Sequence, residues 1–154
     1  MTRFTAHNTS SATLKSSRTE VWKALTDPTL LPELTPYLRR IDVDGDRWTW
    51  HMAKIPVLGR TIGTSFTEVM TFDEPDRIRW SHDDSRTDET TSVEGEYLLE
   101  DAGSGTHVSI ELGVTSELPF PRVARPAVEA AMAAVMAGMG RVFAHHLLKH
   151  LGEK

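Results

Sequence analysis

The sequence predicts an α+β fold in which a curved antiparallel sheet of about seven strands wraps around a long C-terminal helix. Two observations favour it: apolar patterns of period two recur between turn residues along most of the chain, and the C-terminal segment has the period of a helix. Two short helices are expected after the first strand. The 154 residues suit one domain, so residues 1–154 are expected to form one.

The first strand and two helices are expected near the N-terminus. In residues 4–14, the even-numbered positions from Phe4 to Leu14 alternate with a set rich in threonine, as is typical of a strand. Ser17-Arg18-Thr19-Glu20 has the pattern of a capping box, and Asp27-Pro28 is expected to end the helix that follows it. A second short helix is expected from about Thr29 to Leu38.

The middle of the chain is typical of a meander of hairpins. A two-residue loop at Gly45-Asp46 is expected to place Val43 opposite Trp48. Residues 55–59 are expected to form a connection, and the next strand is expected to present one face from Ile62 to Phe72.

The last hairpin has the clearest pattern. The polar residues 83–90 before it are expected to form a solvated loop. The alternation on both sides of the glycine-rich turn then pairs Tyr97 with Ile110 and Leu99 with Val108.

A long helix is expected to close the fold. Prolines in Leu118-Pro119-Phe120-Pro121 cannot continue a sheet, and the helical pattern runs from Pro126 to Leu151. At about 100° per residue, one apolar face is expected to lie against the sheet. This face consists of Val128, Met132, Val135, Met136, Met139, Val142 and Phe143. Its methionines suit either an adaptable cavity wall or ordinary core packing, and the sequence leaves both open.

Composition excludes several classes of protein. The chain has 17 Lys and Arg against 22 Asp and Glu, a net charge of −5. That balance argues against a nucleic-acid partner and against electrostatic docking on anionic membranes. The absence of cysteine excludes disulfides and thiolate metal sites. No secretory h-region and no apolar stretch approaching about 18–20 residues is evident, so a cytoplasmic protein without a membrane span is expected.

Two strings carry a family resemblance. Residues 16–28, SSRTEVWKALTDP, and Gly95-Glu96-Tyr97 followed by residues 103–108 resemble parts of the START-like (SRPBCC) superfamily of polyketide cyclases, birch-pollen-allergen-like proteins and lipid-transfer domains. The resemblance implies a helix-grip fold with a deep cavity between sheet and long helix. It also implies a ligand such as a sterol, lipid, polyketide or plant hormone. Some members are enzymes, and many only bind or carry.

Glu68 and His82 are the candidate polar pair. If Phe72 pairs with Ile78 around the turn at Glu74-Pro75-Asp76, Glu68 lies opposite His82, about 4.5–5.5 Å away between Cβ atoms. Such a pair can orient a ligand carbonyl or hydroxyl, or act as acid and base. A polar contact at the sheet end, open to water, is the alternative.

The expected ligand-binding residues combine this pair with aromatic strand positions and the inner helix face. They are Trp50, Phe66, Glu68, Met70, Trp80, His82, Tyr97, Leu112, Met132, Val135, Met136 and Met139. His146 and His150 have the spacing of zinc ligands on a helix, but no third ligand is evident, so histidines bonded to the backbone are favoured over a metal site. No cofactor is indicated.

Three functions are compatible with these residues. The favoured one is binding or transport of a small hydrophobic molecule, such as a lipid, an isoprenoid or a polyketide-like metabolite. A polyketide aromatase/cyclase or dehydratase using Glu68 and His82 is the second. An accessory protein acting through the apolar loops at residues 55–58 and 118–121 is the third. A homodimer is left open as the oligomeric state.

Overall fold

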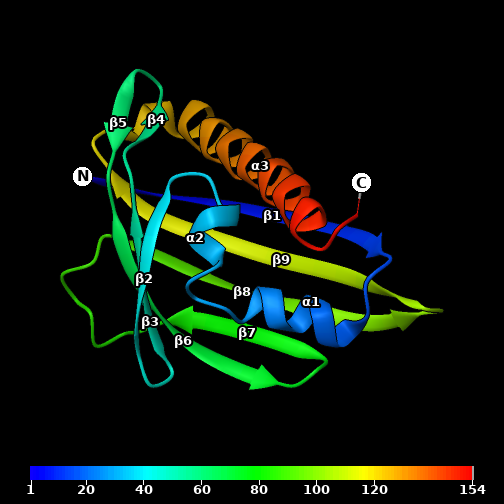
Figure 1. Cartoon of the computed structure of the whole chain (residues 1–154). Helices are drawn as coiled ribbons and strands as arrows, with labels where there is room; N and C mark the ends of the chain where they lie inside the picture. The colour runs from blue at the N-terminus through cyan, green and yellow to red at the C-terminus, as the bar shows by residue number, and fades with distance from the viewer. Residues whose placement is uncertain (154) are drawn as a thin grey trace.

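The computed structural model describes residues 1–153, and a seven-stranded antiparallel sheet forms its frame. The strand order is β1-β9-β8-β7-β6-β3-β2. The bounds are β1 (Thr2–Leu14), β2 (Leu38–Asp44), β3 (Arg47–Met52), β6 (Ser65–Asp73), β7 (Arg77–His82), β8 (Thr91–Ala102) and β9 (Gly105–Leu118). The C-terminal helix α3 (Arg125–His150) runs along β1 and β9 (Figure 1). The predicted fold class is therefore confirmed.

The hairpin registers are those expected from the alternation of apolar residues. Val43 lies opposite Trp48 across the two-residue turn between β2 and β3. Tyr97 lies opposite Ile110, and β8 is paired with β9 along its whole length. In each hairpin the inner face is apolar, so a slip by one residue would turn that face to water.

The segment between β3 and β6 differs from the prediction. Residues 55–62 form a separate hairpin of β4 (Ile55–Val57) and β5 (Arg60–Ile62), and β6 begins at Ser65 rather than Ile62. Leu58 and Gly59, with φ of 47° and 78°, form its two-residue turn. Two successive positive φ values are what a tight hairpin turn requires, so the chain reverses here instead of continuing as a loop.

The two short helices lie between β1 and β2. Helix α1 (Arg18–Leu25) begins as predicted, because the Ser17 hydroxyl accepts a hydrogen bond from the backbone N–H of Glu20 at 3.3 Å. Helix α2 (Leu31–Leu34) is shorter than predicted. Pro36 explains this, since the residue before a proline is disfavoured in helical conformation and Thr35 is extended.

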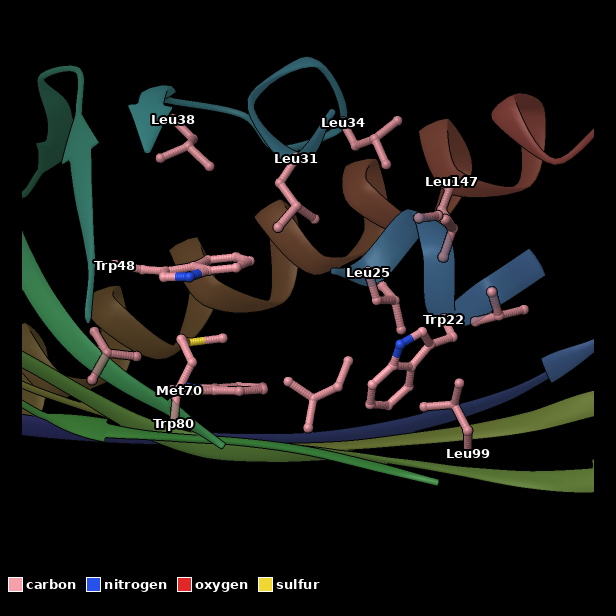
Figure 2. Packing of buried hydrophobic residues seen from close by; sticks show 14 of the residues in the cluster. Trp22, Leu25, Leu31, Leu34, Leu38, Trp48, Met70, Trp80, Leu99 and Leu147 are labelled. Carbon is pink, nitrogen blue, oxygen red and sulfur yellow. The ribbon is translucent and has the colours of Figure 1, made fainter. Parts of the chain in front are cut away.

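The main hydrophobic core lies between the short helices, the sheet and the C-terminal half of α3 (Figure 2). Trp22 anchors α1 there, and its ring packs edge-to-face on Phe72 at 6.2 Å between centroids. A second cluster lies under the first half of α3 and contains Phe4, Leu118 and Val128. The predicted apolar loop at residues 118–121 is part of it, because Phe120 packs on Phe4.

The apolar face of α3 is narrower than the sequence suggests. Val128 and Met132 are buried and Phe143 packs on the main core, but Val142 is 41% exposed, so its assignment to the inner face was wrong. The helical segment Arg122–His150 is also apolar and long enough to cross a membrane by length and composition, which corrects the expectation that no stretch approaches this. In the fold, this helix is the one that packs on the sheet (Figure 1).

The loop at residues 83–90 is anchored rather than freely solvated. The Asp83 carboxylate is buried and pairs with Arg47 at 3.0 Å. The Glu89 carboxylate accepts hydrogen bonds from the backbone N–H and the hydroxyl of Thr67, both at 2.7 Å. The loop therefore covers the outer side of β6 directly behind Glu68, a role that its charged composition does not reveal.

Candidate functional site

The candidate site is centred on Glu68, in the middle of β6. Its neighbours in register are Trp48 on β3 and His82 on β7, so the predicted pairing of Glu68 with His82 is confirmed. The side chain shares the inner face of the sheet with Met70, and Glu68 is only 3% exposed. The alternative of a polar contact open to water therefore does not describe Glu68.

The Glu68 carboxyl has an unusual electrostatic environment. Burial raises its pKa well above the usual range, and within residues 1–153 no cation or hydrogen-bond donor offsets this effect. Its Oε2 atom has no hydrogen-bond partner in the described part of the chain. The protonated form is therefore favoured, and a protonated carboxyl can donate a hydrogen bond to an acceptor.

Other polar atoms near this position are also unsatisfied. Among residues 1–153, Trp50 Nε1 and His82 Nδ1 are buried without a hydrogen-bond partner. Burial, and secondarily the nearby Glu68, raise the pKa of the Tyr97 phenol, which keeps it protonated. Buried polar groups are normally paired, so unpaired polar atoms on one inner face indicate that a further molecule completes them.

Aromatic rings form the walls around these groups. Trp50 stacks on Phe66 with centroids 6.2 Å apart and planes 9° from parallel. Trp80 packs on Tyr97 at 5.3 Å. Such rings provide apolar contact area while their N–H and O–H groups remain available for hydrogen bonds.

Gly95 is a site-forming residue that the sequence analysis did not identify. It lies opposite Trp80, and a Cβ atom at this position would approach the Trp80 ring to 2.9 Å and also collide with the Glu111 carbonyl. Glycine therefore lets the Trp80 ring lie flat over β8. The signal was a glycine inside an otherwise regular strand, which marks a close approach of another group.

The remaining predicted site residues fall into three groups. Trp50, Phe66, Met70, Trp80, Tyr97 and Leu112 belong to or pack on the main core cluster that surrounds Glu68. Met132 and Met136 pack instead with Phe4 in the second cluster. Val135 and Met139 belong to neither cluster, and both are half-buried.

The inner surface of β8 and β9 is incompletely covered. Tyr97, Ile110, Leu112 and Val114 face α3 yet are only half-buried. Asn8, opposite Leu112 on β1, lies close to the backbone of α3 at Gly140 and was not among the predicted site residues. Incomplete packing beside an apolar face is what a hydrophobic ligand requires.

The histidines of α3 do not join this site. His146 Nδ1 lies 3.1 Å from the backbone carbonyl oxygen of Leu34. His146 is therefore bonded to the backbone, as was favoured over a role as a metal ligand. His150 is exposed at the end of the helix. Within residues 1–153, no three His, Cys, Asp or Glu side chains are placed to hold a metal ion.

Comparison with known proteins gives a consistent result. The family model described as "Polyketide cyclase / dehydrase and lipid transport" matches residues 5–152. A search of the curated proteins found no match.

Solved structures share the fold. A conserved protein from Geobacillus kaustophilus superimposes with a TM-score of 0.70 at 17% identity, covering 95% of each chain. A START superfamily protein from Mycobacterium smegmatis gives 0.67 at 13% identity, covering 93% of this chain and 97% of that one. The Zhui aromatase/cyclase from a Streptomyces species gives 0.64 at 14%, with coverages of 94% and 95%. At these identities the likeness establishes the fold alone.

Proposed function

The chain belongs to the polyketide cyclase/dehydrase and lipid-transport family, and on that premise we propose that it binds and carries a small hydrophobic molecule on the inner face of the sheet, under α3. A cytoplasmic location stays a prediction. The observation that carries the proposal is Glu68, a buried carboxyl without an internal partner in residues 1–153.

The cost of burying Glu68 supports binding. A polar group removed from water without a hydrogen bond destabilises a protein by about 1–3 kcal/mol. A ligand oxygen that accepts a hydrogen bond from the protonated Glu68 carboxyl would recover most of that cost. The surrounding rings of Trp50, Phe66 and Trp80 would bury the apolar part of the ligand, at about 25 cal/mol per Å² before association costs.

The same environment defines the class of ligand. No cation in the described part of the chain offsets the burial of Glu68, so an anionic headgroup placed beside it would also lack a counter-charge there. The unsatisfied donor at Trp50 Nε1 suits an acceptor oxygen, and the protonated Tyr97 phenol is also able to donate. We therefore expect a neutral, largely apolar ligand with one or more carbonyl or hydroxyl oxygens.

A polyketide cyclase or dehydratase is the second candidate function. The pairing of Glu68 with His82 favours it, because a protonated carboxyl faces an imidazole across two strands. In an aldol cyclisation, His82 Nδ1 would take the α-proton of one carbonyl while Glu68 donates its proton to the attacked carbonyl oxygen. The new carbon–carbon bond forms between the deprotonated α-carbon and the attacked carbonyl carbon. Return of the proton from His82 to Glu68 through water then restores the pair.

An accessory protein is the third candidate. Its predicted loops are only partly available, since Leu118 is buried and Phe120 packs on Phe4. Leu58, at the tip of the β4–β5 hairpin, is the exposed apolar residue of the two loops.

A binding assay tests the carrier proposal. Nile red is a neutral aromatic ketone whose fluorescence rises in apolar surroundings, and oleate serves as an anionic competitor. We expect Nile red to bind, Glu68→Leu to weaken it about five- to tenfold through loss of one hydrogen bond, and oleate to compete poorly. Glu94→Gln, on the outer face of the sheet, is the matched control and should bind normally. Equal binding by wild type and Glu68→Leu, or displacement by oleate at low concentration, would refute the proposed ligand class.

A further inference from the structure

Charge is distributed unevenly over the molecule. The chain has a net charge of −5, but its helical segment Arg122–His150 carries Arg122, Arg125, Arg141 and Lys149 against the single anion Glu129. Residues 53–64, which include the β4–β5 hairpin, contain Lys54 and Arg60 and no acidic residue. The negative charge of the protein therefore lies on other elements, including the outer face of the sheet at Glu94 and Glu111.

The β4–β5 hairpin and the start of α3 lie at the same end of the molecule. Ile62 of the hairpin packs in one cluster with Val128 and Met132 of α3. Figure 1 shows this hairpin beside the first turns of the helix, with its tip extending beyond them. Residues at the hairpin tip and in the short helix before α3 can therefore contact one extended surface at the same time.

Both of these segments expose an apolar side chain flanked by arginine. Val123 is 88% exposed in η1 (Arg122–Ala124), directly after Arg122. Leu58 is 51% exposed at the hairpin tip, two residues before Arg60. Within residues 1–153, neither Arg60 nor Arg122 has an ion-pair partner.

The outward side of α3 continues this surface. Only 11% of the most apolar window of the helical segment is buried, although the segment packs on the sheet. Most exposed positions between the basic residues are small or apolar, and His145 is the polar exception. The small or apolar ones are Pro126, Ala127, Ala130, Ala134, Gly140, Val142 and Ala144.

We propose that Leu58, Arg60, Arg122, Val123 and the outward side of α3 form a docking surface for an anionic lipid bilayer. Exposed apolar side chains enter the interface, while adjacent arginines pair with lipid phosphates, as in interfacial amphipathic helices. The overall negative charge does not prevent this, because charges further than a Debye length of about 8 Å act weakly at physiological salt. The proposal rests on the proposed function, since a carrier of hydrophobic molecules exchanges them with a membrane.

Vesicle flotation tests the docking surface. The probes are vesicles of phosphatidylcholine alone and of an equimolar mixture of phosphatidylcholine and phosphatidylglycerol. We expect binding to the mixed vesicles only, and loss of binding in about 1 M NaCl, where the Debye length is about 3 Å. Val123→Asp and Arg122→Glu should each weaken binding about tenfold.

A matched control distinguishes an effect on the docking surface from a general effect of an exposed aspartate on the fold. Val43, at the end of β2, is 51% exposed like Leu58 and lies outside the docking surface. Val43→Asp should leave vesicle binding unchanged, whereas Leu58→Asp should weaken it. Equal effects of Val43→Asp and Val123→Asp, or equal binding to both kinds of vesicle, would overturn the proposal.

Two further measurements complete the test. If Val123→Asp converts a dimer to a monomer in light scattering and wild type does not float with vesicles, the surface covers a second copy of the chain and the proposal fails. Nile red binding in solution should be unchanged in Val123→Asp, whereas Glu68→Leu should lose Nile red affinity and keep vesicle binding. Failure of docking and failure of the ligand proposal are thereby distinguished.

Discussion

Glu153, beyond the end of α3, accepts a hydrogen bond from the hydroxyl of Ser16 at 2.6 Å. The same carboxylate accepts bonds from the backbone N–H groups of Lys15 and Ser16, between β1 and α1. The buried Thr106 hydroxyl donates to the Ser16 carbonyl at 2.8 Å. The C-terminal end of the long helix is thus held against the sheet by polar contacts that close one end of the inner space.

Glu153→Gln is expected to loosen this contact. Burial acts to raise the pKa of Glu153, but the hydrogen bonds from Ser16 and from the Lys15 backbone outweigh it, so the folded-state pKa is lowered. A lowered pKa contributes stability above the unfolded value of about 4.3 that is lost as pH falls through the folded value. The variant should lose about 1 kcal/mol at pH 7, and the difference from wild type should shrink below about pH 4. Urea unfolding of both proteins across this range measures it, and a deficit independent of pH would contradict the explanation.

Glu68→Gln is expected to show the opposite dependence on pH. Burial raises the folded-state pKa of Glu68, so the wild type loses stability as pH rises above about 4.3, the value in the unfolded chain. The amide has a similar shape and does not titrate. The thermal midpoint of Glu68→Gln should therefore rise relative to that of the wild type as the pH increases from about 4 to about 8. A constant difference between the two midpoints would show that Glu68 titrates normally.

Leu58→Asn is expected to stabilise the fold while weakening membrane docking. Leu58 has a φ of 47°, a left-handed conformation that costs an ordinary side chain about 1 kcal/mol and that asparagine tolerates better. The unfolding free energy should rise by about 0.5 kcal/mol. Vesicle flotation should weaken because the exposed apolar side chain is lost. A variant that is less stable than the wild type would show that the leucine is not strained at the hairpin tip.

The strands and their registers were predictable because each inner face alternates with a polar outer face. Pairing of Tyr97 with Ile110 and of Glu68 with His82 followed from counting around turns. The hairpin at residues 55–62 was not predicted, since Gly59 is the only signal for positive φ in its turn and Leu58 carries none. Nothing in the residue pattern distinguishes Leu58 from an apolar residue in a loop.

The site was predicted in part. Alternation places Glu68 on the inner face, but only the fold shows that the residue is buried and lacks a partner in residues 1–153. The helical face was assigned by angle alone, which includes Val142 although the curved sheet does not reach it. Glu89 covers β6 through a hydrogen bond from Thr67, which is 22 residues away in the chain. No pattern in the sequence links these two positions.

Gly95→Ala is expected to disrupt both the fold and the site. An added Cβ would lie 2.9 Å from the Trp80 ring and against the Glu111 carbonyl, so the ring or β8 must move. Overpacking of this kind costs about 1–3 kcal/mol, and displacement of Trp80 should weaken Nile red binding as well. Gly63→Ala is the matched control, because its Cβ would only approach the Lys54 side chain, at 3.6 Å. Urea unfolding and Nile red titration of both variants test this, and equal effects of the two substitutions would mean that Trp80 does not depend on the glycine opposite it.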